Sequence, residues 1–68
     1  SRNELTKLIE QIMEKYPARA EVDPASLADG FMSVFEGAFI LEKSMEEVAI
    51  TAQQLHHYKT YVELLFKP

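Results

Sequence analysis

The sequence predicts an all-α fold of three helices, and two observations carry this prediction. Apolar residues recur at helical spacing in three successive segments, and Pro17, Pro24 and Ser44 mark where these segments begin or end. No segment shows the alternation of apolar and polar residues that is typical of a strand. We expect helices over about residues 3–16, 24–43 and 45–66, within a single helical segment that spans residues 1–68.

The first predicted helix has one narrow apolar stripe, and its opposite face is polar. The stripe has helical spacing and comprises Leu5, Leu8, Ile9, Ile12, Met13 and Tyr16. A helix with one such stripe packs against one neighbour and lies at the outside of a domain. The helix is expected to end before Pro17, because the residue that precedes a proline is pushed out of the helical region.

The second predicted helix has a strong start signal. Asp23 is expected to be its N-cap, with Pro24 at the favoured first helical position. Val22 and Leu27 occupy the two positions of a hydrophobic staple. The helix is expected to run to about Lys43.

The third predicted helix follows almost directly. Ser44 and Glu47 fit a capping box, in which the serine bonds forward and the glutamate reaches back. Because almost no loop then separates the second helix from the third, we expect a tight antiparallel corner. One continuous bent helix is the alternative.

Both glycines of the chain lie in the second predicted helix, although glycine destabilises a helix by about 1 kcal/mol relative to alanine. They fall on one line of small residues, which comprises Ser26, Gly30, Ser33, Gly37 and Ser44. We interpret this line as a surface for close contact with another helix, because the packing gained offsets the loss. The alternative is that the two glycines mark a loosely packed or bent helix.

A second copy of the chain is the expected partner of this line. A chain of 68 residues without cysteine is marginal on its own. The third predicted helix also carries more apolar surface than one neighbour needs, in a main stripe and a second shoulder that includes Tyr61. We therefore expect the last two helices of two chains to form an intermolecular four-helix bundle in a homodimer. The expected interface comprises Ser26, Gly30, Ser33, Gly37, Ile40, Leu41, Leu55, Tyr58, Lys59, Val62, Leu65 and Phe66.

Lys59 lies inside the main apolar stripe of the third predicted helix. One interpretation is that it pairs with Glu36 or Asp29 across the interface and fixes the register of the two chains. The other is that its methylenes pack while its amine reaches water.

A pocket for a small apolar ligand is a further expectation. Aromatic and methionine side chains favour such sites. The first two helices supply Met13, Tyr16, Phe31, Met32, Phe35 and Phe39 for it. The alternative is that these residues form plain hydrophobic core.

Composition and motifs argue against several function classes. The formal net charge is −4 and the seven basic residues are scattered, so this chain itself is not expected to bind nucleic acid. No apolar stretch approaches the ~20 residues of a membrane span. The N-terminus does not resemble a signal peptide, so a cytoplasmic location is expected. His56 and His57 point about 100° apart on a helix and have no carboxylate at ligand spacing. We expect no metal site, no cofactor, no catalytic residue and no enzyme activity.

Three motifs between residues 22 and 66 carry a family resemblance. They are Asp23-Pro24, Glu36-Gly37 and the run Tyr61-Val62-Glu63-Leu64-Leu65-Phe66. Together they resemble the C-terminal end of TetR-family transcriptional regulators. In many members the penultimate helix starts with Asp-Pro and has a mid-helix glycine, and the last helix ends in an aromatic and leucine-rich run.

This resemblance implies a homodimeric repressor whose C-terminal domain binds a small apolar effector and so alters the spacing of two DNA-reading heads. The helix-turn-helix of the family does not occur in this sequence. DNA would therefore be contacted only through an N-terminal domain that is missing here. On this interpretation, the chain supplies dimerisation and part of the effector pocket. The alternatives are a stand-alone helical protein–protein interaction module and, third, a carrier of small apolar ligands.

Overall fold

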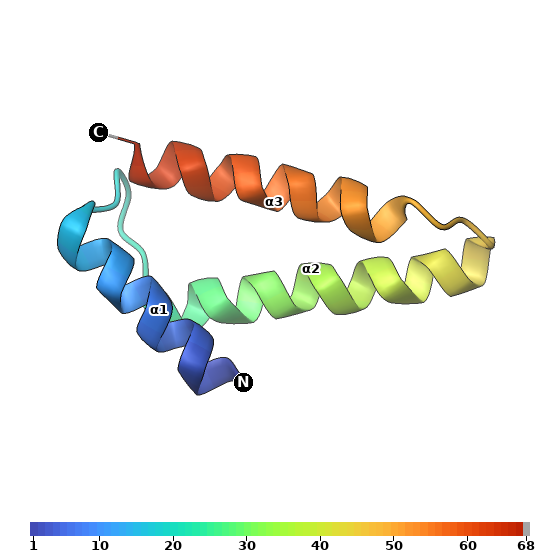
Figure 1. Cartoon of the computed structure of the whole chain (residues 1–68), viewed down its shortest axis with the longest axis horizontal. Helices are drawn as coiled ribbons and strands as arrows, with labels where there is room; N and C mark the ends of the chain where they lie inside the picture. Colours follow the sequence, from blue (N-terminus) through green and yellow to red (C-terminus); the bar gives the residue numbers. More distant parts are fainter. Residues whose placement is uncertain (68) are drawn as a thin grey trace.

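The protein folds as three helices in the computed structural model, which describes residues 1–67 (Figure 1). Helix α1 spans Arg2–Lys15, α2 spans Pro24–Met45 and α3 spans Ile50–Phe66. The described residues contain no strand, so the predicted all-α class is confirmed. Pro68, the last residue of the predicted segment, lies outside the described residues.

Helices α2 and α3 form an antiparallel hairpin, and α1 crosses one end of it (Figure 1). The start of α2 and the end of α3 lie at that end, whereas the turn between α2 and α3 forms the opposite end. The molecule is elongated, with extents of 40 × 24 × 15 Å. The antiparallel arrangement is confirmed, and the alternative of one continuous bent helix is wrong.

Helix α1 begins and ends one residue earlier than predicted. It begins early because Ser1 and Glu4 form a capping box, which was not predicted. The Ser1 hydroxyl accepts from the Glu4 N–H at 3.4 Å and donates to the Glu4 carboxylate at 3.0 Å. The helix ends before Tyr16, whose backbone leaves the helical region with φ −130° and ψ 89°, because the following Pro17 disfavours the helical conformation there.

Helix α2 starts as predicted, with Asp23 as N-cap and Pro24 at the first helical position. It continues to Met45, however, so Ser44 lies inside α2 and the predicted capping box with Glu47 is wrong. The helix ends at Glu46, which takes a left-handed conformation with φ 54° and ψ 41°. This conformation turns the backbone N–H groups of Glu46 and Glu47 back to the carbonyl of Glu42, which closes the last turn.

Helix α3 begins at Ile50 rather than at about residue 45. Its N-cap, Ala49, has no side chain that caps. The carboxylate of Glu42 in α2 takes this role instead, since it accepts from the N–H of Thr51 at 2.9 Å. The cap of α3 therefore comes from the neighbouring helix.

The core of the protein lies at the α1 end of the hairpin. Three helices contribute to a buried cluster that comprises Ile9, Leu27, Ala28, Leu65 and Phe66. The linker between α1 and α2 is tied to this end, because the N–H of Arg19 donates to the carbonyl of Leu65 at 2.7 Å. This hydrogen bond also satisfies a carbonyl in the last turn of α3.

The other half of the hairpin has no third layer, since α1 does not reach it (Figure 1). Ala38 is buried there. Several large apolar side chains are exposed from the middle of α2 to the turn, namely Met32, Phe35, Phe39, Ile40, Leu41, Met45 and Val48. An exposed apolar surface of this extent on a two-helix hairpin is typical of a binding site for another molecule.

Candidate functional site

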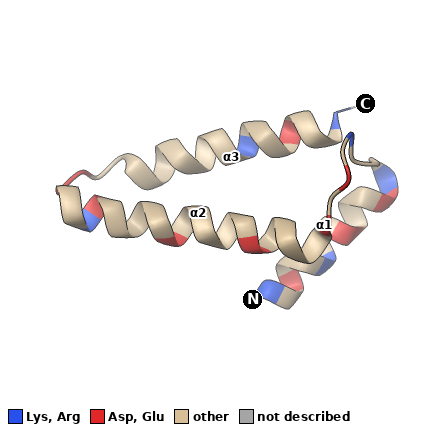
Figure 2. Ribbon diagram, turned by 180° about the vertical axis from the view of Figure 1, so that it is seen from behind, with Lys and Arg blue, Asp and Glu red and all other residues tan. Residues whose placement is uncertain are grey.

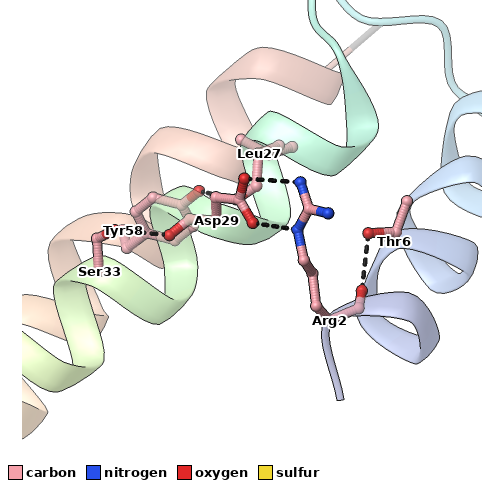
Figure 3. A network of polar contacts seen from close by, with 6 residues as sticks. All are labelled: Arg2, Thr6, Leu27, Asp29, Ser33 and Tyr58. Carbon is pink, nitrogen blue, oxygen red and sulfur yellow. Dashed lines mark hydrogen bonds and ion pairs between the residues drawn. The ribbon is translucent and has the colours of Figure 1, made fainter.

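Tyr58 joins α3 to α2 beside the core (Figure 3). Its hydroxyl donates to the carbonyl of Leu27 at 2.7 Å, and its ring meets that of Phe31 edge to face with centroids 6.0 Å apart. Burial raises the pKa of Tyr58 above its ordinary value, and the nearby Tyr61 adds a smaller effect in the same direction.

Gly30 permits this approach of Tyr58. A Cβ at Gly30 would come within 2.9 Å of the Tyr58 hydroxyl, closer than real contacts allow. Gly30 was predicted to permit close contact with another helix, in a second chain. In the structure, it permits close contact with Tyr58 in α3 of the same chain.

Gly37 has a different environment. A Cβ at Gly37 would meet no described atom within 4 Å. At about 100° per residue, Gly37 shares one exposed side of α2 with Ser26 and Ser33, and Ile40 and Leu41 flank it. We call this surface, from Ser26 to Leu41, the small-residue face. It is open, and Ile40 at its edge is 62% exposed.

A shallow hollow of about 310 Å³ lies at the core end of the small-residue face. Ser26 and Gly30 of α2 line it together with Tyr58 and Tyr61 of α3. The side chain of Tyr61 is half exposed, and that of Leu64, one turn further along α3, is 56% exposed. Neither residue was among those predicted for the interface, although Tyr61 belongs to the second apolar shoulder of the third predicted helix.

The α3 members of the predicted interface lie elsewhere. Leu65 and Phe66 are buried in the core of the single chain. Leu55, Lys59 and Val62 line an apolar cleft between α1 and α3. The structure thus divides the predicted interface. Its α2 members lie on or beside the small-residue face, whereas most of its α3 members lie in the core or in the cleft.

The apolar cleft has a volume of about 310 Å³, and Leu27 and Phe31 of α2 also contribute to it. Its lining comprises Leu5, Leu8, Ile9, Ile12, Leu27, Phe31, Leu55, Tyr58, Lys59, Val62, Glu63 and Phe66. Of the six residues predicted for a ligand pocket, it contains Phe31 alone. Met13 packs against the core, and the others are exposed side chains, namely Tyr16, Met32, Phe35 and Phe39.

The charged residues near these surfaces pair locally. The Nζ of Lys59 lies 3.7 Å from the carboxylate of Glu63, at the edge of the cleft. Asp29 binds Arg2 of α1, whose Nε and Nη2 donate to Oδ1 and Oδ2 at 2.5 and 2.9 Å (Figure 3). The hydrogen bond from Arg2 lowers the pKa of Asp29 below its ordinary value. Within one chain, Lys59 therefore has a partner other than the predicted Asp29 or Glu36.

Charge is sparse on the hairpin (Figure 2). Helix α2 carries charge only at Asp29, Glu36, Glu42 and Lys43. Among residues 1–67, no three His, Cys, Asp or Glu side chains lie where they could hold a metal ion. Over the same residues, no helix has the length and apolar character that crossing a membrane requires.

No protein-family model, curated protein or solved structure gives a match to this chain. Two surfaces are thus the candidates for function, namely the small-residue face and the apolar cleft.

Proposed function

We propose that the chain is a homodimerisation segment, in which α2 and α3 of two copies associate through the small-residue face as a four-helix bundle. One observation supports this most directly. The helix side around Gly37 is open, and apolar side chains that have no cover in one chain border it. A backbone that lacks a Cβ lets the partner helix approach closely, which increases the van der Waals contact.

The dimensions of the hairpin suit a dimer interface. Helix α2 has 22 residues, and a helix of this length spans about 33 Å. Helix α3 has 17 residues and spans about 26 Å. Side by side, the two helices present a face of roughly 600 Å², from their lengths and the ~10 Å diameter of a helix. A specific interface of standard size buries about 800 Å² per partner. A second copy would also cover the half of the hairpin that α1 does not reach.

The biological role proposed for this dimer comes from the family resemblance. Asp23-Pro24, Glu36-Gly37 and residues 61–66 resemble the end of TetR-like repressors. We propose that the chain is the dimerisation and effector-sensing segment of such a repressor, with a regulatory rather than catalytic role. A small apolar effector would then act on DNA release through N-terminal heads that these residues do not include.

Sedimentation equilibrium over a protein concentration series tests the dimer. We expect a dimer that persists to low micromolar concentration. Gly37→Leu should weaken its association at least tenfold, because the added side chain occupies the space that the partner helix needs. Leucine is the better helix former, so loss of the dimer would not reflect loss of the helix.

Ala52→Leu is the matched control for Gly37→Leu. Ala52 is an exposed residue of α3. It precedes Tyr61 by nine positions, which places the two side chains about 180° apart around the helix axis. This substitution adds similar bulk on the opposite side of α3 and should leave the association constant unchanged. A monomeric wild type, or equal association of Gly37→Leu and wild type, would overturn the proposed interface.

A stand-alone helical interaction module is the second candidate. The exposed side chains of Met32, Phe35 and Phe39 favour it, since they extend the apolar surface of the hairpin beyond the small-residue face. The same measurement separates the two candidates, because the module predicts a folded monomer at every concentration.

A further inference from the structure

The apolar cleft differs from the small-residue face in the helices that form it. Residues of α1 and α3 make up most of the lining of the cleft, whereas the small-residue face lies on α2. Leu5 and Ile12 line it from α1, and Leu55 and Val62 line it from α3. We propose that this cleft binds a small uncharged apolar molecule. The proposal deepens the proposed function, since such a molecule would be the effector of the regulatory dimer. Binding itself does not require that the chain dimerise.

The size of the cleft fits a small molecule better than a protein segment. Its volume of about 310 Å³ is roughly twice the ~150 Å³ of an apolar cavity that holds benzene. A molecule of about ten to sixteen carbon atoms, or two to three rings, is therefore the expected size. A partner helix would need more room. It is ~10–12 Å across with its side chains, and it binds in a long groove that holds apolar side chains from several of its turns.

The charge of the cleft favours an uncharged occupant. Its charged lining residues are Lys59 and Glu63, which carry opposite charges and lie 3.7 Å apart with largely exposed side chains. Their charges offset each other, so neither an anion nor a cation gains a dedicated partner. The hydroxyl of Tyr58 already donates to the carbonyl of Leu27. An occupant with unmet polar groups would lose hydration without compensation.

The core residues in the lining of the cleft support binding by burial. Ile9, Leu27 and Phe66, which belong to the core, contribute to its lining. Leu8 is also part of the lining and is 53% exposed, which places it at the rim. Apolar contact with these core residues would remove the occupant from water, and this is the main source of affinity in such sites.

A fluorescence titration with N-phenyl-1-naphthylamine tests the proposal, since this neutral probe emits strongly in apolar surroundings. We expect saturable binding with a Kd of about 10⁻⁴ M or tighter, from the typical affinity per atom of such ligands. The anionic probe 1-anilinonaphthalene-8-sulfonate has a similar ring system and should bind at least several-fold more weakly. Methyl NMR should show shifts at Leu5, Ile12, Leu55 and Val62, and none at Leu41.

Leu8→Glu is the decisive variant. Leu8 is half exposed, so the fold should tolerate a carboxylate there, which circular dichroism can verify. The charge at the rim should weaken binding of the neutral probe at least tenfold. Leu64→Glu is the matched control, because Leu64 is equally exposed but does not line the cleft. Leu64→Glu should retain probe binding.

The outcomes separate this proposal from the proposed dimer. Leu8→Glu should lose the probe and keep the solution mass of the wild type, whereas Gly37→Leu should keep the probe and change the mass. Absence of probe binding by the wild type, equal loss in Leu8→Glu and Leu64→Glu, or tighter binding of the sulfonate would each overturn the proposal. A probe affinity that falls as the dimer forms would also overturn it, because a second copy would then fill the cleft.

Discussion

The hydroxyl of Tyr58 in α3 donates to the carbonyl of Leu27 in α2 at 2.7 Å, and the same hydroxyl occupies the space that a Cβ at Gly30 would need. The hydrogen bond and the glycine therefore depend on each other. Together they set how closely α3 approaches the first turns of α2, beside the core.

The two glycines of α2 should respond differently to alanine. In one chain there is open space at Gly37, so for the monomer Gly37→Ala should raise the free energy of unfolding by about 0.5–1 kcal/mol through helix propensity. At Gly30 the new Cβ displaces the Tyr58 hydroxyl, and the loss of its hydrogen bond, about 0.5–1.5 kcal/mol, should cancel or exceed that gain. Urea unfolding at a protein concentration below that at which the dimer forms measures both.

A double-mutant cycle with Tyr58→Phe provides the control for the glycine prediction. Without the hydroxyl, alanine at position 30 no longer breaks a hydrogen bond, so Gly30→Ala should be less damaging in the Tyr58→Phe background than in the wild type. Additive effects of the two substitutions would contradict the dependence of one residue on the other.

Removal of the Glu42 carboxylate should destabilise the start of α3. In Glu42→Ala the N–H of Thr51 loses its acceptor, which should lower the free energy of unfolding by about 0.5–2 kcal/mol, as for other helix caps. Ser44→Ala should change it by less than about 0.5 kcal/mol, because Ser44 lies within α2. Thermal and urea unfolding distinguish the two. A larger effect of Ser44→Ala would instead favour the capping box that the sequence suggests.

Glu46→Gly should stabilise the protein. Glu46 has a φ of 54°, a left-handed conformation that costs a residue with a Cβ about 1 kcal/mol and costs glycine little. The expected gain is thus about 1 kcal/mol in the free energy of unfolding, measured in urea. Glu47 is the neighbouring control, since its φ is not positive, and Glu47→Gly should give no gain. Equal effects at the two positions would exclude relief of strain at Glu46 as the cause.

The pair of Arg2 and Asp29 should contribute stability that disappears in acid. Hydrogen bonding to Arg2 lowers the pKa of Asp29 in the folded state below its ordinary value of 3.8. The contribution is therefore present above that value and is lost as the pH falls through the lower pKa of the folded state. Melting temperatures between about pH 2 and pH 6 should fall less steeply for Asp29→Asn than for the wild type.

Glu36→Gln is the control for the acid prediction, because Glu36 is an exposed carboxylate of the same helix. Its pH profile should follow that of the wild type. Both Asp29 and Arg2 are largely exposed, so the contribution of the pair should be small and should weaken further in high salt. An Asp29 carboxyl that titrates by NMR at or above 3.8 would show that the pair does not form in solution.

The number of helices and the start of α2 could be predicted from the sequence because the signals act over a few residues. Pro17 ends α1 through its effect on the preceding residue, and Asp23-Pro24 starts α2 through the local backbone. The start of α3 could not be predicted in this way. Its cap is Glu42, which belongs to another helix and reaches Thr51 only because the turn at residues 46–49 brings the helices together.

The two candidate surfaces also combine features that the sequence predicts with features that depend on tertiary packing. Gly30 and Gly37 are equivalent in the sequence pattern, yet one contacts Tyr58 and the other faces open space. Leu65 was expected in a dimer interface and lies in the core of one chain. Helix formation and apolar periodicity depend on neighbours along the chain, so the residues alone determine them. Which side of a helix meets a neighbour depends on how whole helices pack, and only the tertiary structure decides that.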